Sequence, residues 1–284
     1  LGLKTAIVEK RFLGGVCLNI GCIPSKALLK NADVAHTLRE RGKEFGFSFD
    51  NLALDYNVAY DRSRKVSDRL VRGVKFLMKK NEIDVHMGAA KLTTKDTVEV
   101  TPDEGEVETL MAKDIIIATG AHTFVLPGIE LDGEKIVDYE DAILREELPE
   151  SAIIIGGGAI GVEFATIWHA YGVDVTIVEM LDNLLPLEDP KIGKEIEKAY
   201  KKRGIQVMTK TKFQSVETTK KGTKVTVETA EGKETLEASL TLVAIGFRPN
   251  SKGLGLEEVG VKLSDKGNIE IDDRMATNVD GIWA

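Results

Sequence analysis

The chain has 284 residues, enough for two domains and for a substantial core without disulfide staples. Hydrophobic residues make up 43% and charged residues 30%, while 46 acidic residues outnumber 38 basic ones, for a net charge of −8. This balance argues against disorder and against binding to nucleic acid or anionic membranes. No apolar run approaches the roughly 20 residues that span a bilayer, and the first residues do not resemble an export signal. We therefore predict a soluble, cytoplasmic protein.

Short apolar runs alternate with amphipathic segments along the chain, which predicts an α/β fold. The predicted strands cover residues 4–9, 114–118, 151–155 and 174–179, and a further strand is predicted within Leu236–Gly246. One predicted helix begins at Pro24. Further helices are predicted at residues 55–80 and 139–144, in a segment that ends near Tyr171, and at residues 191–202. Proline in the first turn and apolar spacings of three and four residues favour these helices.

Two stretches follow one plan. The run A-I-V-E, which ends at Glu9, matches T-I-V-E, which ends at Glu179, and A-T-G at 118–120 matches A-I-G at 244–246. In the second copy Gly156 precedes Glu179 by 23 residues. The same offset from Glu9 falls near position −14, so we expect the central strand and glycine turn of the first copy to precede this sequence.

Gly156, Gly158 and Gly161 form a G-x-G-x-x-G pattern between a predicted strand and a predicted helix. The three glycines allow a tight turn, a close approach of pyrophosphate to the backbone, and close packing of helix on strand. The helix amino terminus favours an anion. With an acid at the end of the next strand, the pattern predicts a dinucleotide site. The alternative is a glycine-rich turn that binds no nucleotide.

Glu179 is placed to accept hydrogen bonds from both ribose hydroxyls. A 2′-phosphate would meet like charge there, and no arginine lies between residues 180 and 202. Glu179 therefore favours NAD over NADP. The other interpretation is a solvated acid at a strand end.

Cys17 and Cys22 are the only cysteines in the sequence. In an ideal helix residues five apart lie about 8.6 Å apart at Cα, whereas a disulfide requires less than about 7 Å. A bridge therefore needs a distorted turn, which Asn19 and Gly21 make plausible. A structural bridge across so small a loop would add little stability, and a zinc site would need further ligands. A redox pair is the favoured interpretation, with a thiolate assisted by the following helix and by Lys26.

Lys26 and Glu163 each follow one of these motifs. They are either an ion pair beside a cofactor or two unrelated surface charges, and spacing alone does not decide.

The run G-G-V-C-L-N-I-G-C-I-P-S-K-A-L-L at 14–29 closely resembles the active-site segment of the pyridine nucleotide–disulfide oxidoreductases, in particular the branch that oxidises dihydrolipoamide. The similarity continues through A-T-G, G-G-G-A-I-G-V-E, V-E-M and A-I-G-F-R-P-N, in family order. It implies two Rossmann-like domains and an enzyme that uses FAD and NAD. Dihydrolipoyl groups would reduce a Cys17–Cys22 disulfide, and NAD⁺ would leave as NADH.

The resemblance also implies roles for individual residues. Cys17 matches the thiol that meets substrate, Cys22 the thiol beside the flavin, and Lys26 with Glu163 the ion pair near the flavin's reactive nitrogen. Further FAD contacts would come from Glu9, Lys10, Gly14, Gly15, Val16, Cys17, Lys26, Ala90, Thr119, Gly120 and Ala121. NAD contacts would come from Gly156, Gly157, Gly158, Ala159, Ile160, Gly161, Val162, Glu163, Glu179, Phe213 and Gly246.

The implied domains are an FAD-binding domain at 1–148, an NAD-binding domain at 149–248, and a return to the FAD and central domain at 249–284. The family's carboxy-terminal dimer domain, with its histidine–glutamate acid/base pair, is not expected in this chain. No histidine here has a glutamate five residues later, and His169 is expected to pack a helix. The expected partners are lipoyl-carrying proteins of 2-oxoacid dehydrogenase or glycine cleavage complexes, with a homodimer as the full-length form.

Two alternatives stay open. One is another disulfide reductase of the same family, of the glutathione or mercuric type. The other is a non-catalytic NAD-binding fragment, in which residues 1–284 alone bind NAD weakly and turn over little.

Overall fold

The computed structural model describes residues 2–284, which divide into two compact units. The first unit comprises residues 2–19, 69–122 and 247–284, and the second comprises residues 20–68 and 123–246. Within the described residues, no helix combines the length and the apolar character needed to cross a membrane.

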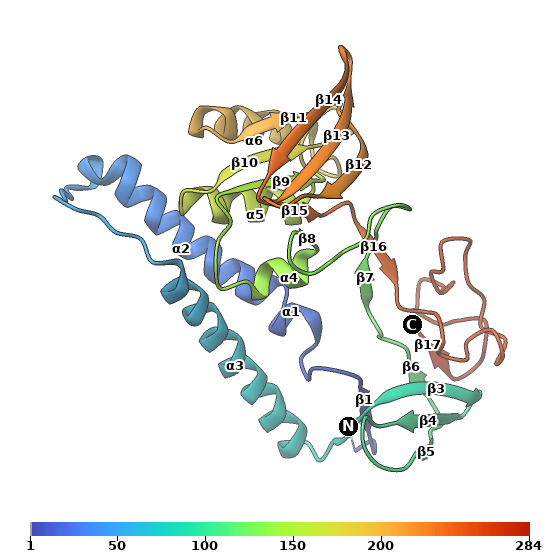
Figure 1. The fold of residues 1–284 in the computed structure, drawn as a ribbon. Coiled ribbons are helices and arrows are strands. Elements are labelled where there is room, and N and C mark those ends of the chain that lie inside the picture. Colours follow the sequence, from blue (N-terminus) through green and yellow to red (C-terminus); the bar gives the residue numbers. More distant parts are fainter. Residues whose placement is uncertain (1) are drawn as a thin grey trace. The chain divides into compact units, whose positions relative to one another are not determined.

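A five-stranded parallel sheet forms the centre of the second unit (Figure 1). Its order is β11-β10-β9-β15-β8, with bounds Gln206–Met208, Asp174–Val178, Ser151–Ile155, Leu240–Val243 and Ile136–Val137. The central strand β9 has the sequence S-A-I-I-I, and its last four residues are buried. Such a continuous apolar run is typical of a parallel strand covered on both faces. The strands predicted at 151–155 and 174–179 are therefore confirmed to within one residue.

The helices of the second unit begin where their sequences supply helix-start signals. Asp138 accepts the backbone N–H groups of Glu140 and Asp141 and so caps α4, while Asp189 caps α6 before a proline. The helices are α2 (Cys22–Arg41), α4 (Tyr139–Leu144), α5 (Ala159–Ala170) and α6 (Pro190–Arg203), with the 3₁₀ helix η1 (Gly42–Phe45). The long helix α3 (Tyr56–Lys80) has its first half in this unit and its second half in the first. All predicted helices are present.

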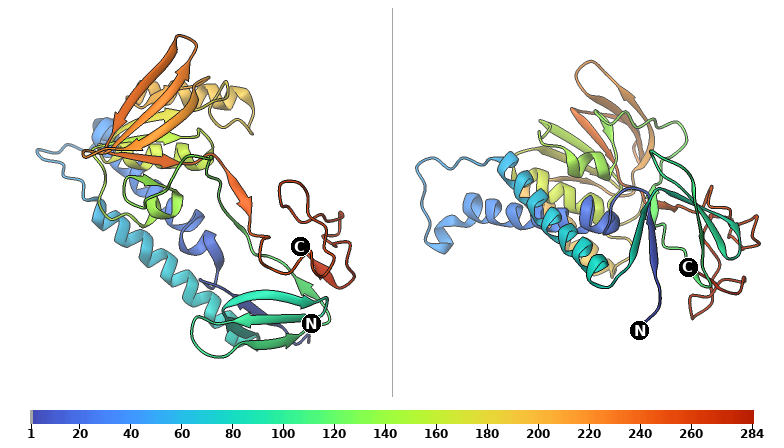
Figure 2. Two further views of the ribbon diagram at one scale, coloured as in Figure 1. Left: turned by 45° about the vertical axis from the view of Figure 1, so that its right-hand side comes forward. Right: turned by 90° about the horizontal axis from the view of Figure 1, so that it is seen from below.

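An antiparallel sheet of β12 (Lys212–Thr218), β13 (Thr223–Thr229) and β14 (Gly232–Ala238) packs beside the parallel sheet (Figure 2). The strand predicted within Leu236–Gly246 is present as β15, but the segment is not one strand, because it also contains the end of β14. The chain changes sheets at Ser239, whose N–H donates to the Ser151 hydroxyl at 3.0 Å, so the segment holds the end of β14 and all of β15. Apolar residues occur on both sides of the break, Leu236 and Ala238 before it and Leu240 after it, so a hydrophobicity pattern does not reveal it.

Within its described residues, the first unit contains three two-stranded sheets and one three-stranded antiparallel sheet. Strand β1 (Ala6–Glu9) pairs with β2 (Asp84–Met87), and β6 (Ile115–Ile116) pairs with β17 (Ile282–Trp283). The antiparallel sheet consists of β3 (Ala89–Thr94), β4 (Thr97–Thr101) and β5 (Glu108–Met111), and the remaining elements are α1 (Gly15–Asn19), β7 (Ala121–Thr123) and β16 (Phe247–Pro249).

The duplicated plan is visible in the strands. In the second unit β9 lies between β10 and β15. Strand β10 ends within the matched T-I-V-E segment, and the matched A-I-G segment directly follows β15. Their counterparts β1 and β6 each have one parallel partner, and no strand within residues 2–284 joins them. Every residue of β15 is buried, whereas Ile116 of β6 is 75% exposed.

The third glycine of the glycine pattern limits how the second unit can pack. A Cβ at Gly161 would lie 2.0 Å from the Gly156 carbonyl oxygen, which is backbone and cannot move aside. We predict that Gly161→Ala lowers the free energy of unfolding by more than about 1 kcal/mol, the scale of an overpacked core.

Urea denaturation measures this effect, and Gly73→Ala in helix α3 is the matched control. Nothing lies within 4 Å of a Cβ at Gly73, so that change should stabilise by about 0.5–1 kcal/mol through helix propensity. Equal stability of Gly161→Ala and the unaltered protein would contradict the packing described here.

Candidate functional site

A glycine turn lies where the carboxyl ends of β9, β10 and β15 meet. At Gly156 the backbone has φ +110°, a conformation that residues with a side chain rarely adopt. A Cβ there would also lie 2.3 Å from the Ala244 carbonyl oxygen, so there is no space for a side chain. Gly158 differs, because nothing lies within 4 Å of a Cβ built there. The turn is therefore tight at its first and third glycines and open at its second, which is the shape that a pyrophosphate against the backbone requires.

The open glycine is also the amino-terminal cap of α5. Gly158 has no side chain to satisfy the first N–H groups of that helix, and the first helical bond runs from the Val162 N–H to the Gly158 carbonyl. Unsatisfied N–H groups and the helix dipole together favour an anion at this position.

Glu179 follows β10 and is 8% exposed. One of its carboxylate oxygens accepts the Gly157 N–H at 2.7 Å, and the other accepts the Leu181 N–H at 2.7 Å. These bonds satisfy a buried charge and fix the carboxylate beside the glycine turn. Each oxygen keeps a further lone pair, so the group can still accept from a ribose hydroxyl.

A loop after Glu179 holds the turn from the other side, and sequence reasoning missed it. The Leu185 N–H donates to the Gly157 carbonyl at 2.8 Å, and Leu185 has φ +50°. The buried Leu184 side chain would be 2.5 Å from a Cβ at Gly157. A leucine with positive φ carries no turn signal in the sequence, so only the structure could reveal this support.

The two cysteines lie on either side of a helix break. Cys17 belongs to α1 and Cys22 is the first residue of α2, with the break at Ile20 and Gly21. Gly21 has φ −128° and ψ −121°, outside the helical region. The distorted turn expected between the cysteines is thus present. Both thiols are exposed, and the described residues contain no disulfide between them, so that bond stays a prediction.

Short polar contacts hold the segments around this break. The Asn19 amide donates to the Leu13 carbonyl at 3.2 Å and to the Gly15 carbonyl at 2.8 Å. In α2 the Ser25 hydroxyl donates to the Gly21 carbonyl at 2.8 Å. Because Cys22 stands at the amino end of a 20-residue helix, the helix dipole favours a thiolate there.

Lys26 and Glu163 form an ion pair. The Lys26 Nζ lies 2.6 Å from Glu163 Oε1, and their side chains are 61% and 24% exposed. Lys26 stands one turn into α2, and Glu163 one turn into α5. The pair joins the helix that begins at Cys22 to the helix that begins at the glycine turn, which settles the pairing that spacing alone left open.

Glu9 in the first unit repeats part of the arrangement around Glu179. Its Oε1 accepts the N–H groups of Arg11 at 2.7 Å and Phe12 at 3.2 Å. The chain then turns through Gly14 and Gly15, both with positive φ, into α1. Val16 is exposed in α1.

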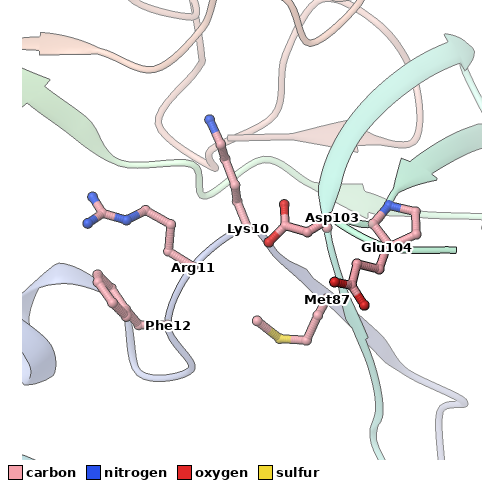
Figure 3. A pocket seen from close by; sticks show the side chains of 8 residues that line it. Lys10, Arg11, Phe12, Met87, Asp103 and Glu104 are labelled. Carbon is pink, nitrogen blue, oxygen red and sulfur yellow. The ribbon is translucent and has the colours of Figure 1, made fainter.

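A cavity of about 650 Å³ opens next to Glu9 (Figure 3). Figure 3 shows charged side chains of both signs around it. Its lining residues are Lys10, Arg11, Phe12, Met87, Gly88, Pro102, Asp103 and Glu104. This size is within the range of cofactor pockets.

The A-T-G segment of the first unit is tied to Asn250. The Thr119 hydroxyl donates to the Asn250 carbonyl at 2.7 Å, the Asn250 amide donates to the Thr119 carbonyl at 3.0 Å, and the Asn250 N–H donates to the Gly120 carbonyl at 2.9 Å. Ala121 begins β7 just beyond. These bonds bring together two motifs that are 131 residues apart, which sequence spacing could not show.

The remaining predicted contact residues lie on several elements. Ala90 is half-buried on β3, Phe213 packs from β12 against the core beneath the antiparallel sheet, and Gly246 follows β15 with φ +126°. Ala159, Ile160 and Val162 form the first turn of α5 with Gly161.

The histidines form no metal site within residues 2–284. The structure nevertheless pairs His86 with Glu108, Nδ1 to Oε2 at 2.6 Å, across 22 residues of sequence. His169 packs α5 against α6, as predicted, through a bond from its Nε2 to the Arg203 carbonyl at 2.9 Å.

The family model described as pyridine nucleotide-disulphide oxidoreductase matches residues 1–284. Together with the glycine turn, the placed acid and the cysteine segment, this match shows that the chain belongs to the pyridine nucleotide-disulphide oxidoreductase family.

Curated relatives cover the whole chain. It is 47% identical over 287 residues to the dihydrolipoyl dehydrogenase of Mycobacterium leprae and 40% identical over 294 residues to that of Bacillus subtilis. The alignments include 100% of this chain but 61% and 62% of those proteins, so the chain spans about three fifths of their length.

Solved structures agree in fold. The crystal structure of LpdA from Mycobacterium tuberculosis superposes with a TM-score of 0.89 at 26% identity, covering 99% of this chain and 61% of that one. The HOCl-induced flavoprotein disulfide reductase RclA from Escherichia coli gives 0.82 at 26% identity, over 99% and 60%. The predicted α/β class is thereby confirmed.

The Lys26–Glu163 pair predicts a measurable coupling between α2 and α5. In a double-mutant cycle with Lys26→Met and Glu163→Gln, we expect a coupling free energy of about 0.5–1 kcal/mol, the upper range for partly exposed pairs. Urea denaturation of the four proteins gives this value.

The Lys30–Asp33 pair, at 2.8 Å within α2, provides the control cycle. Both of its side chains are well exposed, so its coupling should be smaller. Additive effects of Lys26→Met and Glu163→Gln would show that the two helices are not joined by this contact.

Proposed function

We propose that the protein is the larger part of a dihydrolipoamide dehydrogenase, which oxidises protein-bound dihydrolipoamide and reduces NAD⁺ through a Cys17–Cys22 redox disulfide and FAD. The observation that carries this proposal is the Lys26–Glu163 ion pair, because it couples the helix that starts at Cys22 to the helix that starts at the nucleotide turn. A thiol site and a nucleotide site connected in this way suit electron transfer from a dithiol to a nicotinamide.

The residues at the glycine turn fit NAD. The pyrophosphate would rest on the open face of Gly158 at the start of α5, and Glu179 would accept from the adenosine ribose. A 2′-phosphate would be repelled by the Glu179 carboxylate. This repulsion disfavours the NADPH-linked, glutathione-type alternative.

The first-unit residues fit the adenosine half of FAD. Glu9 is held by backbone N–H groups beside the 650 Å³ cavity, as Glu179 is held beside the glycine turn. We propose that Glu9, Lys10, Gly14, Gly15, Val16 and Ala90 contact FAD, with Thr119, Gly120 and Ala121 positioned by Asn250. FAD, when bound, would accept the electron pair from the cysteines and deliver it to NAD⁺.

The chain's own sulfurs would perform the first half of the reaction. A substrate thiolate attacks Cys17 in the disulfide, and the Cys17–Cys22 bond breaks, which leaves Cys22 as a thiolate. The second substrate thiol then displaces Cys17, so the substrate leaves as a cyclic disulfide. Two electrons and two protons have left the substrate, and one proton is released when NAD⁺ becomes NADH. The helix dipole of α2 and the ammonium of Lys26 stabilise negative charge on Cys22.

This function assigns the two Rossmann-like parts as an FAD-binding domain at 1–148, an NAD-binding domain at 149–248, and a return segment at 249–284. The partners would be lipoyl-carrying proteins of a 2-oxoacid dehydrogenase or glycine cleavage complex, and the complete protein would act as a homodimer. We also propose a cytoplasmic location, as expected from the sequence.

Gly158→Ala tests the nucleotide turn. The new methyl group has space in the free protein, so the free energy of unfolding should fall only by about 0.5–1 kcal/mol, the cost of alanine in place of glycine at a helix N-cap. It would occupy the space proposed for pyrophosphate, so the dissociation constant for NADH should rise at least tenfold. NADH fluorescence titration measures this change, with Gly73→Ala as the unaffected control. Unaltered affinity would remove Gly158 from the site.

The coenzyme preference tests Glu179. We expect NADH to bind at least tenfold more tightly than NADPH, and Glu179→Gln to narrow that ratio because the repelling charge is lost. Paired titrations with the two coenzymes give the ratio. A protein that prefers NADPH would refute the assignment.

The complete gene product tests the reaction. It should form NADH from dihydrolipoamide and NAD⁺, and Cys22→Ser should abolish turnover while leaving NADH binding unchanged. NADPH-driven reduction of glutathione disulfide is the comparison assay. Activity in that assay alone would replace our proposal with the glutathione-type alternative.

A further inference from the structure

A second, smaller cavity lies between helices α2, α5 and α6 of the second unit. We call it the α2–α5 cavity; its volume is about 220 Å³, and it is lined by Leu29, Ala32, Asp33, His36, Thr166, His169, Ala170, Arg203 and Ile205. It begins one turn beyond the Lys26–Glu163 pair, since Leu29 follows Lys26 by three residues and Thr166 follows Glu163 by three. None of its residues has a part in the redox or nucleotide chemistry above.

Arg203 carries the clearest unused charge of this cavity. It is the last residue of α6 and is exposed, and its guanidinium forms no ion pair with any residue of the described chain. The acid of the cavity, Asp33, is bound instead by Lys30 at 2.8 Å. The cavity therefore offers a planar cation with five N–H donors. Its one acid, Asp33, is paired with Lys30, and Arg203 acts on it as a weaker, more distant charge.

His169 offers a second unused group. Because a carbonyl can only accept, the contact between His169 Nε2 and the Arg203 oxygen requires the proton on Nε2. Its Nδ1 is buried and has no hydrogen-bond partner within the described residues. A buried polar atom without a partner costs free energy. The neutral Nδ1 is an acceptor, so it would donate to a carboxylate only after it is protonated.

His36 completes the polar wall. Burial, followed by the positive charge of Arg203, lowers the pKa of His36 from its ordinary value. Burial and the Arg203 charge thus disfavour protonation of His36, and a bound anion would offset the effect of that charge. The charged and titratable groups that act on His36 are Asp33, Glu40 and Arg41 of α2, His169 of α5, and Arg203 of α6.

The remaining wall is apolar. Leu29, Ala32, Ala170 and Ile205 present hydrocarbon, and the volume is smaller than the roughly 300–1,000 Å³ of pockets for drug-sized ligands. We infer that the α2–α5 cavity is a binding site for a small carboxylate with an apolar body, held by Arg203 at its charged end and by hydrocarbon around its body. Benzoate has the size and chemistry of such a ligand and serves as the probe.

Proton NMR of the four histidines tests this inference on the purified protein. Benzoate should shift the ring signals of His36 and His169 in a saturable manner, and leave those of His86 and His122 in place. His36→Gln and His169→Gln assign the signals. Binding should be severalfold tighter at pH 6 than at pH 8, because protonated imidazole donates to the carboxylate. Absent or unsaturable shifts would overturn the inference.

A matched pair of substitutions separates a built site from general attraction of anions. Arg203→Met should weaken benzoate binding about tenfold or more, the effect of a lost charge-assisted hydrogen bond. Lys202→Met removes the same charge from the neighbouring exposed position of α6, which does not line the cavity, and should leave binding unchanged. Equal effects of the two changes, or equal displacement by sulfate at the same ionic strength, would contradict a carboxylate site.

Discussion

The close approach of helix α5 to strand β9 is the constraint on which the site depends. Gly161 lies so near the Gly156 carbonyl that no side chain fits between them, and this contact sets where the helix begins. Once α5 is fixed, its unsatisfied N–H groups open at Gly158, and Glu163 lies one turn later within reach of Lys26. Through Lys26 the same helix meets α2, whose first residue is Cys22. The packing of Gly161 against Gly156 therefore helps to determine where α2, and with it Cys22, lies.

The two acids at strand ends show the same local arrangement in both units. Glu9 and Glu179 each accept the N–H two residues further on, at 2.7 Å, so both carboxylates are fixed by the loop that they begin. Glu179 has a further anchor at Gly157, the turn between β9 and α5. Such preorganisation means that a ribose would meet a carboxylate already oriented, with little ordering cost on binding.

Much of the fold and of the site could be predicted from the sequence, because the signals involved are local. The alternation of strand and helix, the glycine pattern, the acid after β10 and the break between the cysteines each occupy a few adjacent residues. The break at Ser239 could not be predicted, since apolar residues continue on both sides while the chain changes sheets. The ties of Thr119 to Asn250 and of His86 to Glu108 are equally hidden, because they join residues that only the tertiary fold brings together. The conformation of Leu185 could not be predicted either, because leucine rarely adopts a positive φ. A hydrogen bond from its N–H to the Gly157 carbonyl stabilises this conformation.

The central claim is that Cys17 and Cys22 form one two-electron redox pair. Differential alkylation with mass spectrometry, across a series of dithiothreitol redox buffers, measures the state of each sulfur directly. Both cysteines should become alkylatable together, with a single midpoint and a slope for two electrons, and peptides with one alkylated cysteine should stay rare. Two independent transitions, or thiols that remain alkylatable under oxidising conditions, would contradict it.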